Sequence, residues 1–282
     1  MSHRKRNWVL FAVLVALLAA GLFWIVWTNT HFVTTYFTIE NPKIPEAFAG
    51  FRIAQVSDLH NHKWGTKLTD QLAKEDPDII VVTGDLVDSS HTDFEIAMDF
   101  LEKAMNIAPV YYVTGNHEAW LSDYNILARQ MEEAGVHMMD DSSVLLTKGD
   151  ASVNLIGIMD PDFVERDTSV QQAVVETKLQ PMLKEEMYNI VLCHRPEVFA
   201  AYAELEADLV FTGHAHGGQI RIPFVGGLIA PNQGFFPKYT EGVYHQGQTD
   251  MVVSRGLGNS ILPIRINNSP ELVVVTLESE AS

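Results

Sequence analysis

Five short polar motifs constrain this chain more than any other feature, because each follows directly after an apolar run. The runs are short enough for buried strands, and the stretches between them place apolar residues at helical spacing. Strands that alternate with helices in this way are typical of an α/β protein. The motifs are Asp58-Leu59-His60, Gly84-Asp85-Leu86-Val87-Asp88, Gly115-Asn116-His117-Glu118, His194 and Gly213-His214-Ala215-His216.

The same pattern predicts the order of the elements along the chain. An edge strand at residues 32–39 precedes the α/β region. Helices are expected at residues 66–75, 93–105, 121–134 and 169–186. Strands are expected at residues 52–57, 78–83, 110–114, 190–193, 208–212 and 272–277, with an antiparallel pair at 144–147 and 152–158.

Each motif stands at the carboxyl end of its strand. In an open α/β sheet this is the edge at which ligands bind. Buried strands fix the backbone there, and the loops that follow aim the side chains. We therefore expect polar residues that are far apart in the sequence to converge on one small volume.

The residue types in the motifs are those of a metal site. Carboxylate, imidazole and amide groups bind divalent first-row ions such as Mn, Fe and Zn. Seven candidate ligands are too many for one ion with open positions, whereas two ions that share a carboxylate can use them all. The sequence therefore favours two ions about 3.5–4 Å apart, which would clamp a phosphoryl group and activate a water molecule. The candidates are Asp58, His60, Asp85, Asn116, His194, His214 and His216.

Near the N-terminus, residues 8–27 carry no charged side chain and are almost entirely apolar. A helix of this length spans about 30 Å, enough for the hydrocarbon core of a bilayer. We expect an uncleaved single-pass anchor at residues 1–27, with a cleaved signal peptide and a buried core helix as the alternatives. The basic run Arg4-Lys5-Arg6 would stay cytoplasmic at the cell membrane. A tether and edge strand at residues 28–50 would then lead to an extracytoplasmic catalytic domain at residues 51–282.

The chain is acidic, with 19 Lys and Arg residues against 36 Asp and Glu residues and a formal net charge of −17. Such a surface repels nucleic-acid backbones, so a nucleic-acid partner is not expected and a nuclease is disfavoured. Cys193 is the only cysteine, which excludes an intrachain disulfide. Its position within an apolar run predicts a buried strand residue.

The motifs, complete and in order across residues 57–219, resemble those of the calcineurin-like metallophosphoesterase superfamily. The C-terminal part is similar to a membrane-associated bacterial branch, the YkuE/YaeI-like phosphodiesterases. One departure is Ala215, at a position between two histidines where threonine is usual and where no metal ligand is needed. The segments similar to the branch are Gly217-Gly218-Gln219-Ile220, Pro231-Asn232-Gln233-Gly234, Phe236-Pro237-Lys238-Tyr239 and Ser254-Arg255-Gly256-Leu257-Gly258.

This resemblance implies a four-layer α/β/β/α sandwich, two divalent metal ions and a role for each motif residue. His117 would protonate the leaving oxygen or stabilise its charge, and Asp88 would orient the imidazole of His117. The metal ligands would form two sets with Asp85 as the bridge: Asp58, His60 and His216 for one ion, and Asn116, His194 and His214 for the other.

Other side chains are weaker candidates for substrate contact. His62 could reach a substrate, with a solvent-facing side chain as the alternative. Arg195 could bind a phosphate oxygen through two N–H groups, with a structural salt bridge as the alternative. Glu118 is expected to support a turn. Aromatic residues that could contact a base, a sugar or an acyl chain, or pack a small sheet, are Phe224, Phe235, Phe236, Tyr239 and Tyr244.

These observations predict a membrane-anchored phosphoesterase that hydrolyses a phosphodiester or pyrophosphate bond with a metal-activated water. Its substrate would be a phosphate ester, and proximity to the bilayer suggests a lipid-linked or envelope precursor. One alternative is a non-catalytic sensor or scaffold that binds metal or phosphate. Another is a phosphomonoesterase or a nuclease. The presence of both His117 and Asp88 argues against the non-catalytic alternative. The sequence specifies no protein partner.

Overall fold

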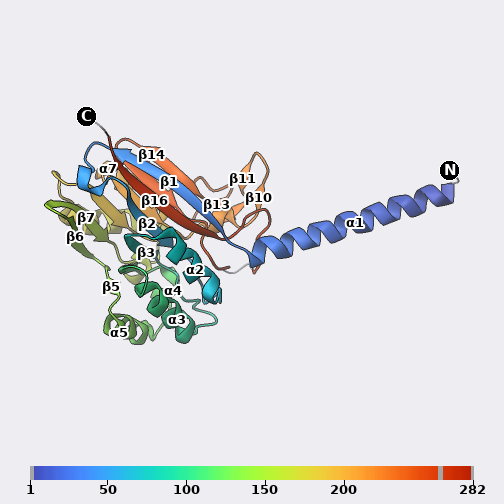
Figure 1. Cartoon of the computed structure of the whole chain (residues 1–282), viewed down its shortest axis with the longest axis horizontal. Coiled ribbons are helices and arrows are strands. Elements are labelled where there is room, and N and C mark those ends of the chain that lie inside the picture. Colours follow the sequence, from blue (N-terminus) through green and yellow to red (C-terminus); the bar gives the residue numbers. More distant parts are fainter. Residues whose placement is uncertain (1–2, 260–262, 281–282) are drawn as a thin grey trace.

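The computed structural model describes residues 3–259 and 263–280. Helix α1 (His3–Thr30) projects away from the body, as Figure 1 shows. Within it, Arg4–Thr30 is long and apolar enough to cross a membrane, and its most apolar stretch is not buried by the rest of the chain. By length and composition, α1 is therefore a candidate membrane span that contains the predicted residues 8–27.

The body is built on two six-stranded sheets. Strands of the first sheet, in spatial order, are β1 (Val33–Asn41), β16 (Glu271–Ser279), β2 (Phe51–Val56), β3 (Ile79–Thr83), β4 (Val110–Val113) and β5 (His137–Met138). Strands of the second sheet are β14 (Gly242–Gln246), β15 (Thr249–Val253), β9 (Leu209–Thr212), β8 (Asn189–Leu192), β7 (Ala151–Gly157) and β6 (Ser142–Lys148).

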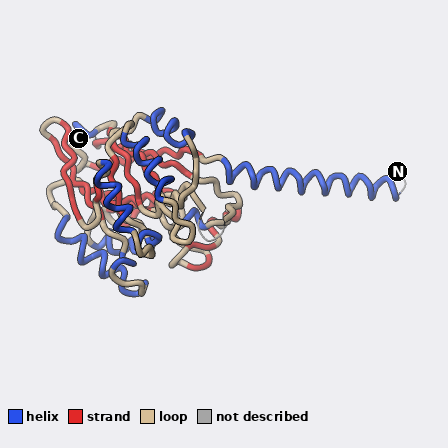
Figure 2. Tube along the Cα trace, turned by 90° about the horizontal axis from the view of Figure 1, so that it is seen from below, coloured by secondary structure: helices blue, strands red, loops and turns tan. Residues whose placement is uncertain are grey.

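Three buried clusters define the layers. Between the sheets, Ile53 and Val81 of the first pack with Leu155 and Ile190 of the second. A second cluster joins the outer face of the first sheet to its covering helices, and a third does the same for the second sheet. The expected α/β/β/α sandwich is therefore confirmed, and Figure 2 shows its helices outside the strands. The covering helices are α2 (Thr66–Glu75), α3 (Phe94–Met105) and α5 (Tyr124–Ala134) on one side, and α6 (Thr168–Leu179) and α7 (Phe199–Glu204) on the other.

Most elements form where the sequence pattern predicts them, and two helices are shorter than expected. Helix α6 ends at Leu179 rather than at residue 186, because Pro181 has no N–H to continue the helical hydrogen bonds. Helix α5 begins at Tyr124 rather than at residue 121, since the short helix α4 (Asn116–Ala119) and a turn precede it. Gly135, in the left-handed conformation, ends α5.

Strand β1 is the predicted edge strand. It pairs in parallel with β16, with Val33 opposite Glu271, and thereby joins the segment after α1 to the last strand of the chain. Beyond β9 the chain forms two small hairpins before it re-enters the second sheet. These are β10 (Arg221–Ile222) with β11 (Gly226–Gly227), and β12 (Ile229–Ala230) with β13 (Gly234–Phe235).

Candidate metal centre

Five strand ends from both sheets meet at one place. β2, β3 and β4 run parallel in the first sheet, and β8 and β9 run parallel in the second. Backbone hydrogen bonds join the loops beyond these ends: Asp58 N donates to Gly84 O at 3.0 Å, and Gly213 N donates to His194 O at 3.1 Å. The convergence expected from the sequence is therefore present.

One buried cluster contains Asp58, His60 and His216. The Nε2 atoms of His60 and His216 are 3.1 Å apart, and Asp58 Oδ1 lies 3.4 Å from His216 Nε2. Ser57 Oγ donates to Asp58 Oδ2 at 2.6 Å, and His214 N donates to Asp58 Oδ1 at 3.0 Å. These bonds fix the carboxylate of Asp58 toward the two imidazoles.

A second buried cluster contains Asp85, His194 and His214. Asp85 Oδ2 is 3.2 Å from His194 Nε2, and His214 Nδ1 is 3.3 Å from the same nitrogen. Asp85 Oδ2 also lies 3.6 Å from His60 Nε2 in the first cluster. One carboxylate oxygen therefore stands between the two clusters, as a bridging ligand requires.

Asn116 belongs to the same site by position. The residue after it, His117, donates its backbone N–H to Asp85 Oδ1 at 2.8 Å. The side-chain oxygen of Asn116 is buried and has no hydrogen-bond partner among the described residues. A buried carbonyl oxygen without a donor is costly unless a cation or water satisfies it.

The electrostatics of the two clusters suit divalent ions. Burial lowers the pKa of His60 to about 3 and that of His216 well below its usual range, so both rings are neutral and offer lone pairs. Burial also opposes the charging of His194, but the carboxylates of Asp85 and Asp58 outweigh it and raise the pKa of His194 to about 10. The site thus attracts positive charge, and metal binding would displace the proton of His194. The donor set therefore fits the metals that the sequence predicts.

Two glycines allow the motif loops to approach one another. A Cβ at Gly213 would overlap Ser57 Oγ and lie 2.5 Å from Asp58 Oδ2. A Cβ at Gly115 would lie 2.6 Å from the backbone N of Asp85. Any larger residue at either position would push a predicted ligand aside.

Glu118 fastens two of the motif loops together. Its Oε2 accepts hydrogen bonds from the backbone N–H groups of Asp85 at 2.8 Å and Gly115 at 2.7 Å, and its Oε1 accepts one from Val87 at 3.2 Å. Burial, followed by the nearby charge of Asp85, raises the pKa of Glu118 to about 8. The turn-supporting role expected for Glu118 is confirmed, and it extends to the loop that carries Asp85.

His117 lies beside the first cluster, with its ring centroid 4.5 Å from that of His60 in an edge-to-face arrangement. The backbone N–H of Ser89 donates to His117 Nδ1 at 3.0 Å, and Ser89 Oγ lies 3.2 Å from the same atom. Because Nδ1 is the acceptor, the proton of the neutral ring is on Nε2. His117 therefore has an N–H available for donation.

Asp88 has other contacts than the one expected. Its Oδ1 accepts hydrogen bonds from the backbone N–H groups of Ser90 at 2.7 Å and His91 at 3.2 Å, and its Oδ2 lies 3.8 Å from His60 Nδ1. In this structure Ser89, rather than Asp88, is the hydrogen-bond partner of His117 Nδ1. The carboxylate of Asp88 also lies within 4.8 Å of ring nitrogens of His60 and His117, so its expected role in orienting the imidazole of His117 stays a prediction.

Arg195 is buried in an ion-pair network. Its Nε and Nη2 donate to the two carboxylate oxygens of Asp160 at 2.6 and 2.7 Å, and Nη2 is 3.0 Å from Asp162 Oδ1. Only Nη1 approaches the metal centre, at 3.2 Å from His214 Nε2. The salt-bridge alternative is therefore confirmed, and a phosphate contact by Arg195 stays a prediction.

Arg265 is a buried site residue that lies outside the five motifs, so no sequence pattern identifies it. Its Nη2 lies 3.2 Å from His216 Nδ1. The backbone of Arg265 bonds to α1 instead. Its N–H donates to Asn29 Oδ1 at 2.8 Å, and its carbonyl oxygen accepts from Asn29 Nδ2 at 2.7 Å. Asn29 belongs to the last turn of α1, so Arg265 connects the candidate membrane span to a predicted metal ligand.

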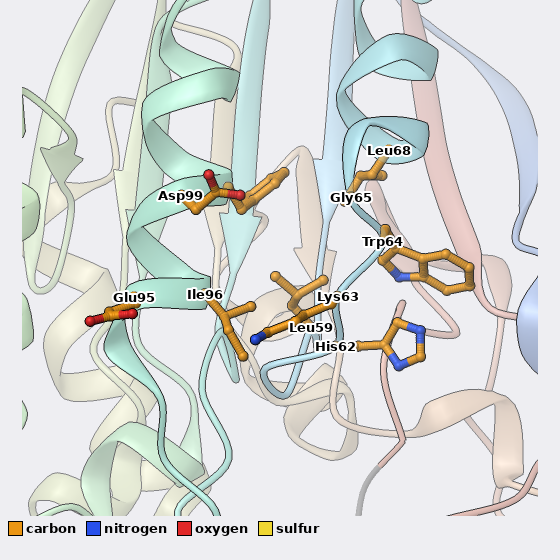
Figure 3. A pocket seen from close by; sticks show the side chains of 10 residues that line it. Leu59, His62, Lys63, Trp64, Gly65, Leu68, Glu95, Ile96 and Asp99 are labelled. Carbon is orange, nitrogen blue, oxygen red and sulfur yellow. The ribbon is translucent and has the colours of Figure 1, made fainter.

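His62 lines a cavity of about 360 Å³ between α2 and α3, next to the loop that carries Asp58 and His60. Figure 3 shows its ring beside that of Trp64, and the two centroids are 4.4 Å apart. Burial, and then the charge of Arg265, lowers the pKa of His62. His62 is thus partly enclosed rather than solvent-facing, and its contact with a substrate stays a prediction.

An α/β/β/α sandwich with two linked Asp, His and Asn clusters at its strand ends defines a metal-dependent phosphoesterase. The chain belongs to the calcineurin-like phosphoesterase family, which matches residues 51–218. The family resemblance inferred from the motifs is therefore confirmed. Metallophosphoesterases use divalent metals, and the two clusters are candidate groups to hold them.

Individual relatives align over most of the chain. The metallophosphoesterase YkuE of Bacillus subtilis (strain 168) is 32% identical over 260 residues, which cover 87% of this chain and 85% of that protein. Phosphodiesterase YaeI of Escherichia coli (strain K12) is 26% identical over 238 residues, which cover 81% of this chain and 83% of that protein. A transmembrane protein with metallophosphoesterase domain from Danio rerio is 25% identical and covers 84% of this chain and 55% of its own length.

Proposed function

We propose that the chain is a membrane-anchored phosphoesterase that uses two metal ions to hydrolyse a phosphodiester or pyrophosphate bond. The observation that carries the proposal is the position of Asp85 Oδ2, 3.6 Å from His60 Nε2 and 3.2 Å from His194 Nε2. A carboxylate between two imidazole clusters is the arrangement that a pair of ions needs.

In this proposal the predicted ligands divide as the two clusters do. Bound ions would neutralise charge on the phosphoryl group and lower the pKa of a water molecule. The side chain of Asp85 would be shared between the ions. The remaining ligands would be Asp58, His60 and His216 for one ion, and Asn116, His194 and His214 for the other.

His117 would act on the leaving group. Ser89 donates to its Nδ1, which leaves the Nε2–H as the donor for the departing oxygen. Asp88 would orient the imidazole of His117, since its carboxylate lies within 4.8 Å of a ring nitrogen of His117 and 3.8 Å from His60 Nδ1. The Nε2–H would donate a hydrogen bond to the departing oxygen and stabilise its developing negative charge, while the ring keeps its proton.

The substrate would be a diester or pyrophosphate rather than a monoester. The name of one relative, phosphodiesterase YaeI, supports the diester. An anchor at residues 1–27, a tether at 28–50 and a catalytic domain at 51–282 would hold the site close to a bilayer. The basic residues Arg4, Lys5 and Arg6 favour a cytoplasmic N-terminus and an extracytoplasmic body. A lipid-linked or envelope-precursor phosphate fits that location.

The test is a metal and turnover measurement on the full chain in detergent. Metal content would be measured by elemental analysis, and hydrolysis of bis(p-nitrophenyl) phosphate and p-nitrophenyl phosphate would be followed with added Mn. Two metals per chain with preferential cleavage of the diester would support the proposal. Two metals without turnover of either compound would favour a non-catalytic sensor, and absence of bound metal would refute the dinuclear site.

A pair of variants separates catalysis from metal binding. His117→Ala should lower turnover strongly and leave the metal content near that of the wild type. His245→Ala is the matched control, because this side chain is 71% exposed on β14 and outside both clusters. Loss of metal from His117→Ala would contradict the role given to His117. Cleavage of DNA in a gel assay would instead favour a nuclease, which the net charge of −17 disfavours.

A further inference from the structure

The two small hairpins carry apolar side chains on the outside of the molecule. Phe224 is fully exposed, and Phe235 and Phe236 are 71% and 63% exposed. Large exposed aromatic side chains grouped on one surface mark a contact site rather than ordinary surface. We call the exposed apolar residues in and beside these hairpins the hairpin patch: Ile222, Phe224, Val225, Phe235, Phe236 and Ile264.

The hairpins that carry the patch lie at the end of the body from which α1 leaves, as strands β10, β11 and β13 show in Figure 1. Hydrogen bonds trace this proximity. Asn29 of α1 bonds to the backbone of Arg265, and Ile266 accepts from the backbone N of Arg221 at 2.9 Å. Arg221 begins β10. The side chain of Asn29 and the backbone of residues 265 and 266 therefore link α1 to the first hairpin through hydrogen bonds.

The segments that meet at this end carry no acidic side chain of their own. Residues 1–39, 209–240 and 251–270 contain no Asp or Glu and are the three longest such stretches of a chain with 36 acidic residues. α1, both hairpins and the described part of the segment around Arg265 belong to these stretches. Few carboxylates would therefore repel these segments from a lipid surface. The two that reach the hairpins from neighbouring segments are engaged there, because Glu241 pairs with Arg221 and Glu197 accepts a hydrogen bond from Asn232.

Two of the exposed phenylalanines have an uncommon backbone conformation. Phe224 has φ +68° and Phe236 has φ +54°, in the left-handed region that bulky residues rarely adopt. Such conformations persist only where the surrounding structure holds them, and they are common at ligand contacts. The hairpins are held at their base, where Leu228 N donates to Gly218 O at 3.1 Å and Gly218 closes the turn that begins at His216.

We propose that the hairpin patch inserts into the interfacial region of the bilayer that α1 crosses. Phenylalanine and aliphatic side chains bury favourably at the boundary between head groups and acyl chains. Because the base of the hairpins is hydrogen-bonded to the turn that begins at His216, the metal centre would open beside the membrane surface. This proposal rests on the membrane span of the proposed function, and its occupant is a lipid bilayer.

The test uses the full chain in nanodiscs of phosphatidylcholine, with a polarity-sensitive dye attached to single introduced cysteines. Phe224→Cys and Phe235→Cys probe the hairpin patch, and Leu14→Cys probes α1. Asp150→Cys is the matched control, because it lies in the exposed turn between β6 and β7, at the opposite end of the body in Figure 1. The chain without an added cysteine gives the labelling background, since Cys193 is fully buried.

Spin-labelled lipid should quench the dye at positions 224 and 235 several-fold more than at position 150, and aqueous iodide should show the reverse order. Lipid quenching at position 14 alone would overturn the hairpin contact while leaving the membrane span intact. Quenching at none of the positions would refute both. Protection from iodide at positions 224 and 235 without lipid quenching would assign the patch to a second copy of the chain and overturn the bilayer contact.

Discussion

Removal of the Glu118 carboxyl group should destabilise the two loops that carry the predicted metal ligands Asp85 and Asn116. Three buried backbone N–H groups, those of Asp85, Gly115 and Val87, donate to this side chain. Each buried donor left without an acceptor costs about 1–3 kcal/mol, so Glu118→Ala should lose about 3–9 kcal/mol before the gain from no longer burying a carboxyl group. Glu118→Gln keeps one oxygen for Asp85 and Gly115 and leaves only Val87 unsatisfied, at about 1–3 kcal/mol.

The assay is thermal unfolding of the full chain in detergent, followed by tryptophan fluorescence. For a domain of this size about 1 kcal/mol corresponds to roughly 2–4 °C in Tm, so Glu118→Gln should melt about 2–12 °C below the wild type and Glu118→Ala lower still. Glu133→Gln is the matched control, because Glu133 is exposed on α5 and should change the free energy of unfolding by less than about 0.5 kcal/mol.

The order of the three variants decides the matter. If Glu118→Ala melts at the temperature of Glu133→Gln, the three hydrogen bonds do not stabilise the fold as the structure indicates. If Glu118→Gln and Glu118→Ala melt together, the number of unsatisfied N–H groups does not determine the loss.

Three further predictions address the packing, the pH dependence and the thiol of this chain. Gly213→Ala should lower the metal content and reduce the free energy of unfolding by about 1–3 kcal/mol, because the added Cβ would overlap Ser57 and approach Asp58. Elemental analysis tests the loss of metal, with Gly21→Ala as the control because a Cβ has free space there. Burial raises the pKa of Asp140 to about 6. The protonated side chain therefore supports the fold fully below about pH 4, and the free energy of unfolding falls by up to about 3 kcal/mol as the pH rises through 6 and the carboxyl group ionises. Asp140→Asn, which retains an oxygen for Thr114, should therefore melt above the wild type at pH 7.5 and not at pH 4; an equal shift at both values would contradict the burial of this charge. Burial raises the pKa of Cys193 to about 11, and iodoacetamide should label it only when urea unfolds the chain.

The sequence by itself determined the order of strands and helices and the composition of the site, and the resemblance of its motifs to a known family implied the four layers. Apolar runs and helical spacing are local properties, and they predicted the strands that end at Asp58, Asp85 and Asn116 as well as the candidate span. Polar residues placed after parallel strands must meet at one edge, so convergence followed from order alone. Residue type then restricted the chemistry to divalent metals.

Only the tertiary structure decided which atoms support those residues. Ser89 rather than Asp88 contacts His117 Nδ1, and Glu118 joins two loops that are distant in sequence. Arg265 has no motif around it, yet it connects α1 to His216.

The same distinction applies to the aromatic residues of the C-terminal part. The sequence presents Phe224, Phe236 and Tyr239 as one group, but the first two are exposed and Tyr239 is buried against Phe199 of α7. Exposure and hydrogen-bond partners depend on which elements pack together, because a side chain's neighbours come from segments that no local pattern relates. The order of the strands brought the candidate metal ligands together, and tertiary packing alone decided which side chains hydrogen-bond to them.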